Sequence, residues 1–174
     1  MAVVSAREVQ AAYAMAGHRG DCRRGGGCWW TRRLAILAGA FVGLGAIYST
    51  TVLAGSSSLP YGVQRLLGGL VFCLGLVLVI VGGAELFTGN NLIIMAWANK
   101  KISATQLLRN WGIVYVGNFV GSVLTALIMY FTRQYTFGNG AVGLTALNIA
   151  NTKSSLEFIP AVALGIMCNA MVCM

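Results

Sequence analysis

A polar, glycine-rich segment, GGAELFTGNN, interrupts an apolar stretch of the chain at residues 82–91. Five of its residues are assigned a structural role in a broken helix: Gly82, Gly83, Glu85, Gly89 and Asn90. Inside a membrane, non-helical backbone is tolerated only where it is buried in protein or lines a water-filled cavity. A charged group at that depth marks a transport pathway or a pairing partner. The segment therefore predicts a broken or re-entrant helix beside a passage, in which Glu85 accepts hydrogen bonds from freed backbone groups rather than carrying protons.

Groups that could catalyse a reaction or hold a metal are scarce. The chain has one histidine, His18, four acidic residues and five cysteines, and no two cysteines form a Cys-x-x-Cys pair. Zinc and haem sites need tighter cysteine spacing or more histidines. Acid–base and nucleophilic catalysis need a constellation for which this chain has little material. We therefore expect no enzyme, no catalytic residue, no metal site and no cofactor.

The composition is that of an integral membrane protein. Of the 174 residues, 57% are apolar and only 9% are charged, whereas an average soluble domain has about 45–50% apolar and about 25% charged residues. The apolar residues collect into runs of about 20, the length of a membrane-spanning helix. The 12 basic residues outnumber the 4 acidic ones, but bases beside apolar spans set topology, so nucleic acid is not expected as a partner. We predict an all-α protein that has the lipid bilayer as its surroundings.

Four apolar runs define the expected architecture. The predicted spans are at about residues 34–54, 66–98, 111–131 and 158–174, which together make a transmembrane channel domain at 34–174. The second span is broken by the polar segment, because residues 92–98 alone are too short to cross a membrane. Residues 1–33 form an N-terminal segment that is amphipathic up to Gly17 and irregular from His18, and residues 132–156 form a long polar connection.

Basic residues predict the orientation in the membrane. Six of the 12 bases precede the first span, and the segment 99–110 carries three more. Because cytoplasmic loops are enriched in Lys and Arg, we place the N-terminus and residues 99–110 in the cytoplasm and residues 132–156 outside. This is the orientation of a multi-pass protein of the cell inner (plasma) membrane.

Two GxxxG pairs, Gly39/Gly43 and Gly117/Gly121, predict closely packed helices.

Three motifs carry a resemblance to a known family. They are GGAELFTGNN at residues 82–91, NWGIVYVGNFVG at 110–121 and ALGIMCNAMVC at 163–173. From residue 34 onward the sequence resembles the formate/nitrite transporter family, and most closely its formate channel members. The resemblance implies an aquaporin-like helical bundle of six spans, with two broken helices, assembled as a homopentamer. It also implies one pore per protomer for small monovalent anions, formate and nitrite, which pass together with protons or in neutralised form.

The same resemblance places six residues on the pore pathway: Phe72, Leu76, Leu86, Thr88, Lys153 and Asn169. Thr88 faces the pathway, and Asn169 lines the fourth span. Leu86 belongs to an apolar constriction on the outer side, whereas Leu76 and Phe72 belong to one nearer the cytoplasm. Lys153 lies above the outer vestibule, where a fixed positive charge raises the local anion concentration. Apolar constrictions then reject ions that cannot be neutralised.

Two features depart from the family pattern. The family's pore-centre histidine belongs to its fifth span, whereas this chain ends within the fourth and has no histidine after His18, which leads us to interpret it as an incomplete protomer. Residues 18–30 do not resemble the family's N-terminal helix and indicate a divergent end or an altered reading frame. The alternatives are a neutral-solute pore for water or glycerol, a membrane anchor of a redox enzyme, and a non-conducting truncated fragment. The aquaporin NPA motif is missing, and the spans contain no histidine to ligate haem.

Overall fold

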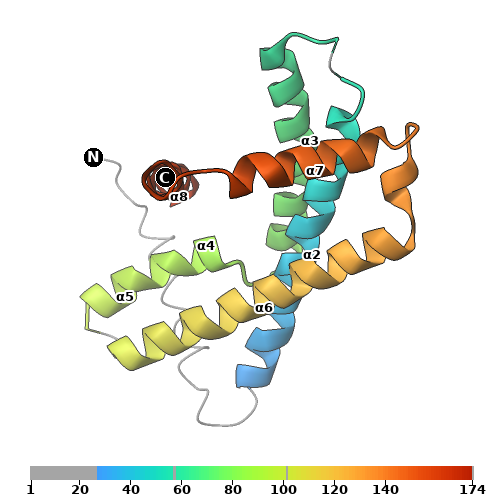
Figure 1. Cartoon of the computed structure of the whole chain (residues 1–174). Helices are drawn as coiled ribbons and strands as arrows, with labels where there is room; N and C mark the ends of the chain where they lie inside the picture. Colours follow the sequence, from blue (N-terminus) through green and yellow to red (C-terminus); the bar gives the residue numbers. More distant parts are fainter. Residues whose placement is uncertain (1–26, 57, 101, 174) are drawn as a thin grey trace.

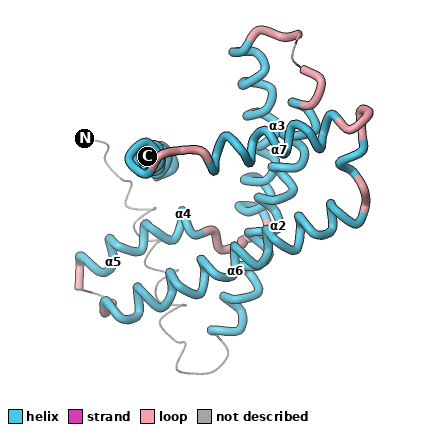
Figure 2. Tube along the Cα trace, viewed as in Figure 1, coloured by secondary structure: helices cyan, strands magenta, loops and turns pink. Residues whose placement is uncertain are grey.

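The computed structural model describes residues 27–56, 58–100 and 102–173, and every regular element in these ranges is a helix (Figure 1, Figure 2). In chain order the elements are α2 (Gly27–Leu53), α3 (Tyr61–Val81), α4 (Phe87–Asn90), the 3₁₀ turn η2 (Asn91–Ile93), α5 (Ile94–Ala98), α6 (Ala104–Phe131), the 3₁₀ turn η3 (Gln134–Thr136), α7 (Ala141–Ser154) and α8 (Phe158–Cys173). The predicted N-terminal segment 1–33 lies outside the described residues up to residue 26. Its last part, expected to be irregular, is instead the start of α2.

Three of the helices, α2, α3 and α6, are long and apolar enough to cross a membrane. Each begins five to seven residues earlier than the apolar run that predicted it, because local signals outside that run start the helix. Pro60 occupies the N-cap of α3. Ser103 and Gln106 form a capping box at the start of α6, which satisfies two otherwise unpaired N–H groups. In the first turns of α2, the Arg33 guanidinium lies 4.5 Å from the centre of the Trp29 ring, a cation–π contact.

The expectation of a long polar connection at residues 132–156 is wrong, because α7 occupies residues 141–154 of it. The polar side chains there do not interrupt the helix, since the hydroxyls of Thr145 and Thr152 bond to carbonyls one turn earlier at 2.8 Å. The helix begins after Gly140, which has a φ of +85°. A short break follows, at which α7 and α8 meet at 107°, so that the pair forms a bent fourth candidate span.

The centre of the fold is α2, which packs against both α3 and α6 (Figure 1). An added Cβ on Gly45 would lie 3.0 Å from Gly75 Cα on α3. A Cβ on Gly39 would overlap the carbonyl oxygen of Asn118, and one on Gly121 would overlap that of Ile36. The glycines of both GxxxG pairs thus let α2 and α6 approach as closely as their spacing predicts.

The same contacts give the directions of the helices. Leu53 faces Gly68, so α3 runs antiparallel to α2, whereas Ala35 faces Gly117 and therefore α6 runs parallel to α2. One end of the bundle accordingly holds the beginnings of α2 and α6, which we call the N-terminal end. The opposite end holds the turn between α2 and α3 together with α7, and we call it the turn end. The break after α3 lies toward the N-terminal end, because Glu85 bonds to Leu34.

Candidate functional site

The break after α3 is a glycine-terminated turn, which confirms that the second span is interrupted. Gly82 caps the helix, and Gly83 follows with a φ of +59°, a left-handed conformation that glycine adopts without a steric penalty. The N–H of Gly83 bonds to the carbonyl of Ile80 at 3.2 Å, and the N–H of Ala84 bonds to that of Val79 at 2.9 Å. These are the paired hydrogen bonds of a Schellman motif, and they stop α3 while satisfying its last carbonyls.

Glu85, the next residue along the break, is removed from solvent. Its side chain is only 6% exposed, and its backbone N–H donates to the carbonyl of Leu34 on α2 at 3.2 Å. A buried carboxylate is costly unless hydrogen bonds compensate it. Asn90, itself 3% exposed, donates to Glu85 Oε2 at 3.4 Å and to Asn110 Oδ1 at 3.2 Å. These contacts link the break to α6.

A single side chain on α6, Asn118, joins the break to α2. Its Nδ2 donates to the carbonyl of Ala35 and to that of Glu85, both at 2.9 Å. Its Oδ1 accepts from the backbone N–H of Phe87 at 3.1 Å. The first N–H groups of a helix have no partner within it, so Asn118 supplies an acceptor that the short helix α4 lacks. Three parts of the fold are therefore held by one amide.

Aromatic side chains of α6 hold the other side of the resumed helix. The ring of Phe87 meets those of Trp111 and Tyr115 edge-on, with centroids 6.3 and 5.6 Å apart. Trp111 also donates from Nε1 to the carbonyl of Asn90 at 3.1 Å. Edge-to-face pairs at these separations are favourable beyond the area they bury. The start of α4 is thus in contact with both polar and apolar groups of α6.

Sequence reasoning missed these α6 residues as parts of the site. The four are Asn110, Trp111, Tyr115 and Asn118. The segment 110–121 indicates a family, but its helical periodicity carries a second signal that the motif alone does not show. Trp111, Tyr115 and Asn118 have the spacing i, i+4 and i+7, which places them on one helix face. An amide and two aromatic residues on one face were therefore the signal that could have found the site.

The polar residues after the break are more regular than expected. Thr88, Gly89 and Asn90 lie within α4, and the chain then continues through η2 into α5. Gly89 and Asn90, which were expected in the broken part of the helix, therefore lie in the helix that resumes after it. Gly89 has nothing within 4 Å of an added Cβ and no positive φ, so neither space nor backbone conformation requires glycine there.

The residues expected on the pathway are spread over four elements. Thr88, half-buried in α4, and Asn169, exposed on α8, belong to helices that contact each other. Phe72 and Leu76 project from α3 with 39% and 42% of their surfaces exposed. Leu86 is the half-buried N-cap residue of α4. The structure brings Thr88 and Leu86 beside the break and leaves Phe72 and Leu76 on the preceding helix.

The order in which Phe72, Leu76 and Leu86 follow one another along the bundle is the reverse of the expected one. Gly75, between Phe72 and Leu76 on α3, packs against Gly45 halfway along α2, whereas the break beside Leu86 is bonded to Leu34 near the start of α2. Leu86 therefore lies nearer the N-terminal end of the bundle than Phe72 and Leu76 do. The expected order, with Leu86 outside, is incompatible with the predicted topology because α3 enters from the turn end.

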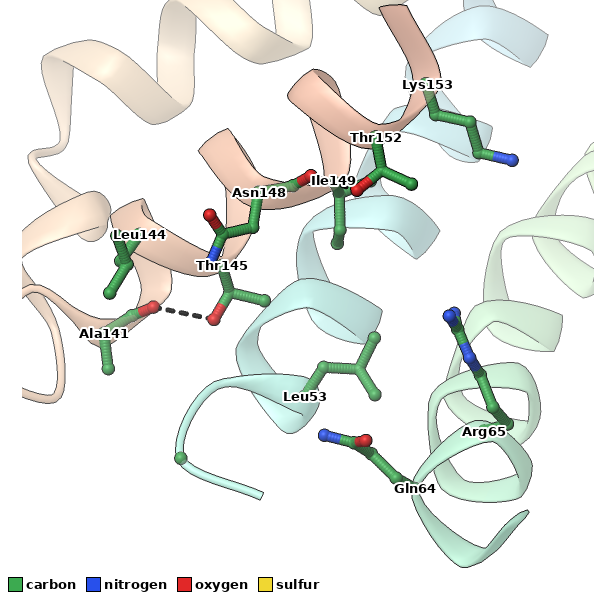
Figure 3. A pocket seen from close by; sticks show the side chains of 11 residues that line it. Leu53, Gln64, Arg65, Ala141, Leu144, Thr145, Asn148, Ile149, Thr152 and Lys153 are labelled. Atoms are coloured by element: carbon green, nitrogen blue, oxygen red, sulfur yellow. Dashed lines mark hydrogen bonds between the residues drawn. The ribbon is translucent and has the colours of Figure 1, made fainter. Parts of the chain in front are cut away.

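Lys153 lies at the turn end, on the wall of an open groove of about 600 Å³ between α2, α3 and α7 (Figure 3). The polar residues of that wall are Gln64, Arg65, Thr145, Asn148, Thr152 and Lys153. Leu53 contributes from the end of α2. The side chain of Lys153 is exposed, so its charge acts on the groove through solvent.

Metal ligands do not gather in the described part of the chain. No group of three or more His, Cys, Asp or Glu residues there could hold a metal ion. Cys73 on α3 and Cys168 on α8 are free and exposed. The chemistry available at the break is therefore that of amides, one carboxylate, a hydroxyl and apolar side chains.

The sequence matches a family model and several curated relatives. The model described as Formate/nitrite transporter matches residues 26–174. The formate channel FocA of Escherichia coli (strain K12) is 43% identical over 141 residues, which cover 81% of this chain and 50% of that protein. The formate channel BtFdhC of Bacillus thuringiensis is 36% identical over 142 residues, covering 81% of this chain and 54% of that protein.

Solved structures share the fold. A structure described as "Pentameric formate channel with formate bound" superposes with a TM-score of 0.80 at 46% identity, covering 84% of this chain and 57% of that one. A second, described as "FNT family ion channel", has a TM-score of 0.72 at 26% identity, covering 88% of this chain and 59% of that one. The chain thus spans about half the length of the curated relatives it matches.

Proposed function

Because this chain belongs to the formate/nitrite transporter family, we propose that it lines a membrane channel for small monovalent anions, with formate as the principal substrate and nitrite as a second one. The relatives named formate channels support formate, and the family description supports nitrite. The proposed role is passage across the bilayer together with protons, without a catalytic step.

The observation that carries this proposal is the break between α3 and α4, held by Asn118 and Glu85. An anion that leaves water for an apolar environment faces a large desolvation cost. A break that hydrogen bonds hold in place next to apolar side chains can give a narrow passage a defined shape. Phe72 and Leu76 form the outer apolar constriction and Leu86 the inner one, while Thr88 offers a hydroxyl beside the inner constriction. Such constrictions pass a neutralised acid and reject an ion that stays charged.

Lys153 and Asn169 complete the proposed pathway. Lys153 stands at the turn end, where its charge concentrates anions before they reach the outer constriction. Asn169 lies on α8, which contacts α4, and it offers an amide to a passing carboxylate. Glu85 is proposed as a structural acceptor, because its carboxylate is engaged by Asn90.

The proposed setting is the plasma membrane, with the N-terminus in the cytoplasm and five copies per assembly. Membrane embedding follows from the family and from three apolar helices of spanning length. The orientation rests on the distribution of basic residues. The pentamer is supported by the similar solved structure, which is that of a pentameric formate channel. The many exposed large apolar side chains on α3 and α6 give lipid and neighbouring copies an apolar surface to cover.

Proteoliposomes containing the full-length protein test this function. We expect labelled formate to enter faster than into empty vesicles, and we expect little swelling in glycerol. Swelling in glycerol without formate entry would instead identify a neutral-solute pore. If a monodisperse, reconstituted protein transports neither formate nor glycerol, the proposal is overturned.

A further inference from the structure

The groove at the turn end carries two cationic side chains from different helices. Lys153 comes from α7 and Arg65 from α3, and the two reach toward the space between these helices from opposite sides (Figure 3). The two acidic residues in the described part of the chain, Glu85 and Glu157, are not among the residues that line it. The groove therefore has walls of one sign, the arrangement that concentrates counter-ions.

Arg65 also lines a second, smaller cavity. This cavity of about 250 Å³ lies against α3 and is bounded by Ser49, Leu53, Arg65, Gly68, Gly69 and Phe72. Leu53 and Arg65 are common to both cavities. Arg65 thus stands where the groove of Lys153 adjoins the space that leads along α3 to Phe72, the outermost residue of the proposed constriction.

The position of Arg65 is held by its own helix. Its guanidinium carbon lies 5.1 Å from the centre of the Tyr61 ring, one turn earlier. A cation–π contact of this kind orients the guanidinium and leaves its N–H donors available. Because the guanidinium is planar with donors in a fixed fork, it can bind both oxygens of a carboxylate through two parallel N–H groups, a geometry that an ammonium does not offer.

We propose that Arg65 is a second anion-binding residue of the entrance, which receives a small carboxylate such as formate between Lys153 and the outer constriction. This inference rests on the proposed function, and it assigns to Arg65 a role beyond membrane topology. Lys153 gathers anions over the groove as a point charge, and Arg65 orients the carboxylate at the next position inward. Its neutral replacement weakens binding, and it does so most at low salt, where the charge is least screened.

Binding can be measured separately from transport. The probe is [¹³C]formate, whose NMR line broadens when it exchanges with the full-length protein in nanodiscs. We expect Arg65→Gln to raise the apparent Kd about three- to tenfold at low salt, since a cleft lined by one sign of charge concentrates ligand by about tenfold or more. Arg65→Lys should recover part of this loss by restoring the charge without the fork. The difference between wild type and Arg65→Gln should shrink at high salt.

Arg133→Gln is the matched control, because it removes the same charge from an exposed arginine that lines neither cavity. We expect it to bind formate within about twofold of wild type, since surface charges at a distance are screened. Equal broadening in wild type and Arg65→Gln, equal losses in Arg65→Gln and Arg133→Gln, or no broadening in wild type would each overturn the inference. A formate flux assay on the same samples tests the proposed function independently. If formate is transported but Arg65→Gln binds it as tightly as wild type does, the proposed channel function stands and the proposed binding role of Arg65 is wrong.

Discussion

Asn118 Oδ1 accepts a hydrogen bond from the backbone N–H of Phe87 at 3.1 Å, across 31 residues of sequence. A side chain from one helix thereby replaces the carbonyl that the first turn of another helix lacks. The same amide donates to the carbonyls of Glu85 and Ala35, so that α6 helps to position the break that the glycines after α3 begin. The shape of the proposed passage therefore depends on a residue outside the break.

Asn118→Ala should destabilise the break. It leaves the carbonyl of Glu85 and the N–H of Phe87 without these bonds, and each buried group left unpaired costs about 1–3 kcal/mol. We expect a clearly lower melting temperature in detergent and a loss of formate uptake, with Asn118→Asp intermediate because it keeps the acceptor for Phe87. Asn151→Ala, an exposed asparagine on α7, serves as the control. An Asn118→Ala protein as stable as that control would show that the hydrogen bonds of Asn118 do not hold the break.

Gly83→Ala should cost about 1–2 kcal/mol of stability, because an L-residue in the left-handed conformation meets a steric penalty of that size. No atom lies within 4 Å of the added Cβ, so the effect is one of backbone conformation alone. Gly89→Ala is the matched comparison, since its added Cβ also meets open space but its φ is not positive. Thermal unfolding of both variants should show a decrease for Gly83→Ala only. Equal melting temperatures would contradict the role of the left-handed turn.

Gly121→Ala should force α2 and α6 apart. The added Cβ would overlap the backbone carbonyl of Ile36, and backbone atoms cannot move aside as a flexible side chain can. Overpacking of this kind costs about 1–3 kcal/mol or more. Gly112→Ala, on the same helix but in open space, should be tolerated. Size-exclusion profiles and melting temperatures of the pair measure the difference, and indistinguishable profiles would argue against a tight α2–α6 contact.

Glu85→Gln should keep both the fold and formate uptake. Its amide oxygen can still accept the hydrogen bond that Asn90 donates to the carboxylate. Glu85→Ala should lower stability, because the buried amide of Asn90 loses an acceptor. Uptake rates of the two variants in proteoliposomes check this. A folded Glu85→Gln protein that no longer takes up formate would identify Glu85 as a proton carrier instead.

The break itself could be predicted from sequence because glycines and a carboxylate within an apolar run are local signals. The close packing of α2 on α6 also followed from local spacing, at Gly39 and Gly121. By contrast, the side chain of Asn118 bonds to residues that are 31 to 83 positions away in the sequence. No local sequence pattern specifies which distant residues Asn118 contacts, although the helix face that it shares with Trp111 and Tyr115 could have been recognised.

Two other features escape prediction for different physical reasons. The polar residues of α7 suggest irregular backbone, whereas its threonines bond to their own helix and leave it intact. The order of the residues proposed for the two constrictions follows from tracing the chain from the turn end through Phe72 to Leu86. The direction of α3 relative to α2 decides that order, and it is a property of the packed helices.

Uptake of labelled formate by proteoliposomes containing the wild-type protein, Leu86→Trp or Leu92→Trp tests most directly whether anions cross at the break. Leu86 is the N-cap residue of α4, and Leu92 is an exposed leucine of the neighbouring turn η2. We expect wild type to exceed empty vesicles, Leu86→Trp to fall about tenfold as the bulky ring closes an apolar constriction, and Leu92→Trp to match wild type. Wild-type uptake by a Leu86→Trp protein that melts at the wild-type temperature would contradict a passage through the break.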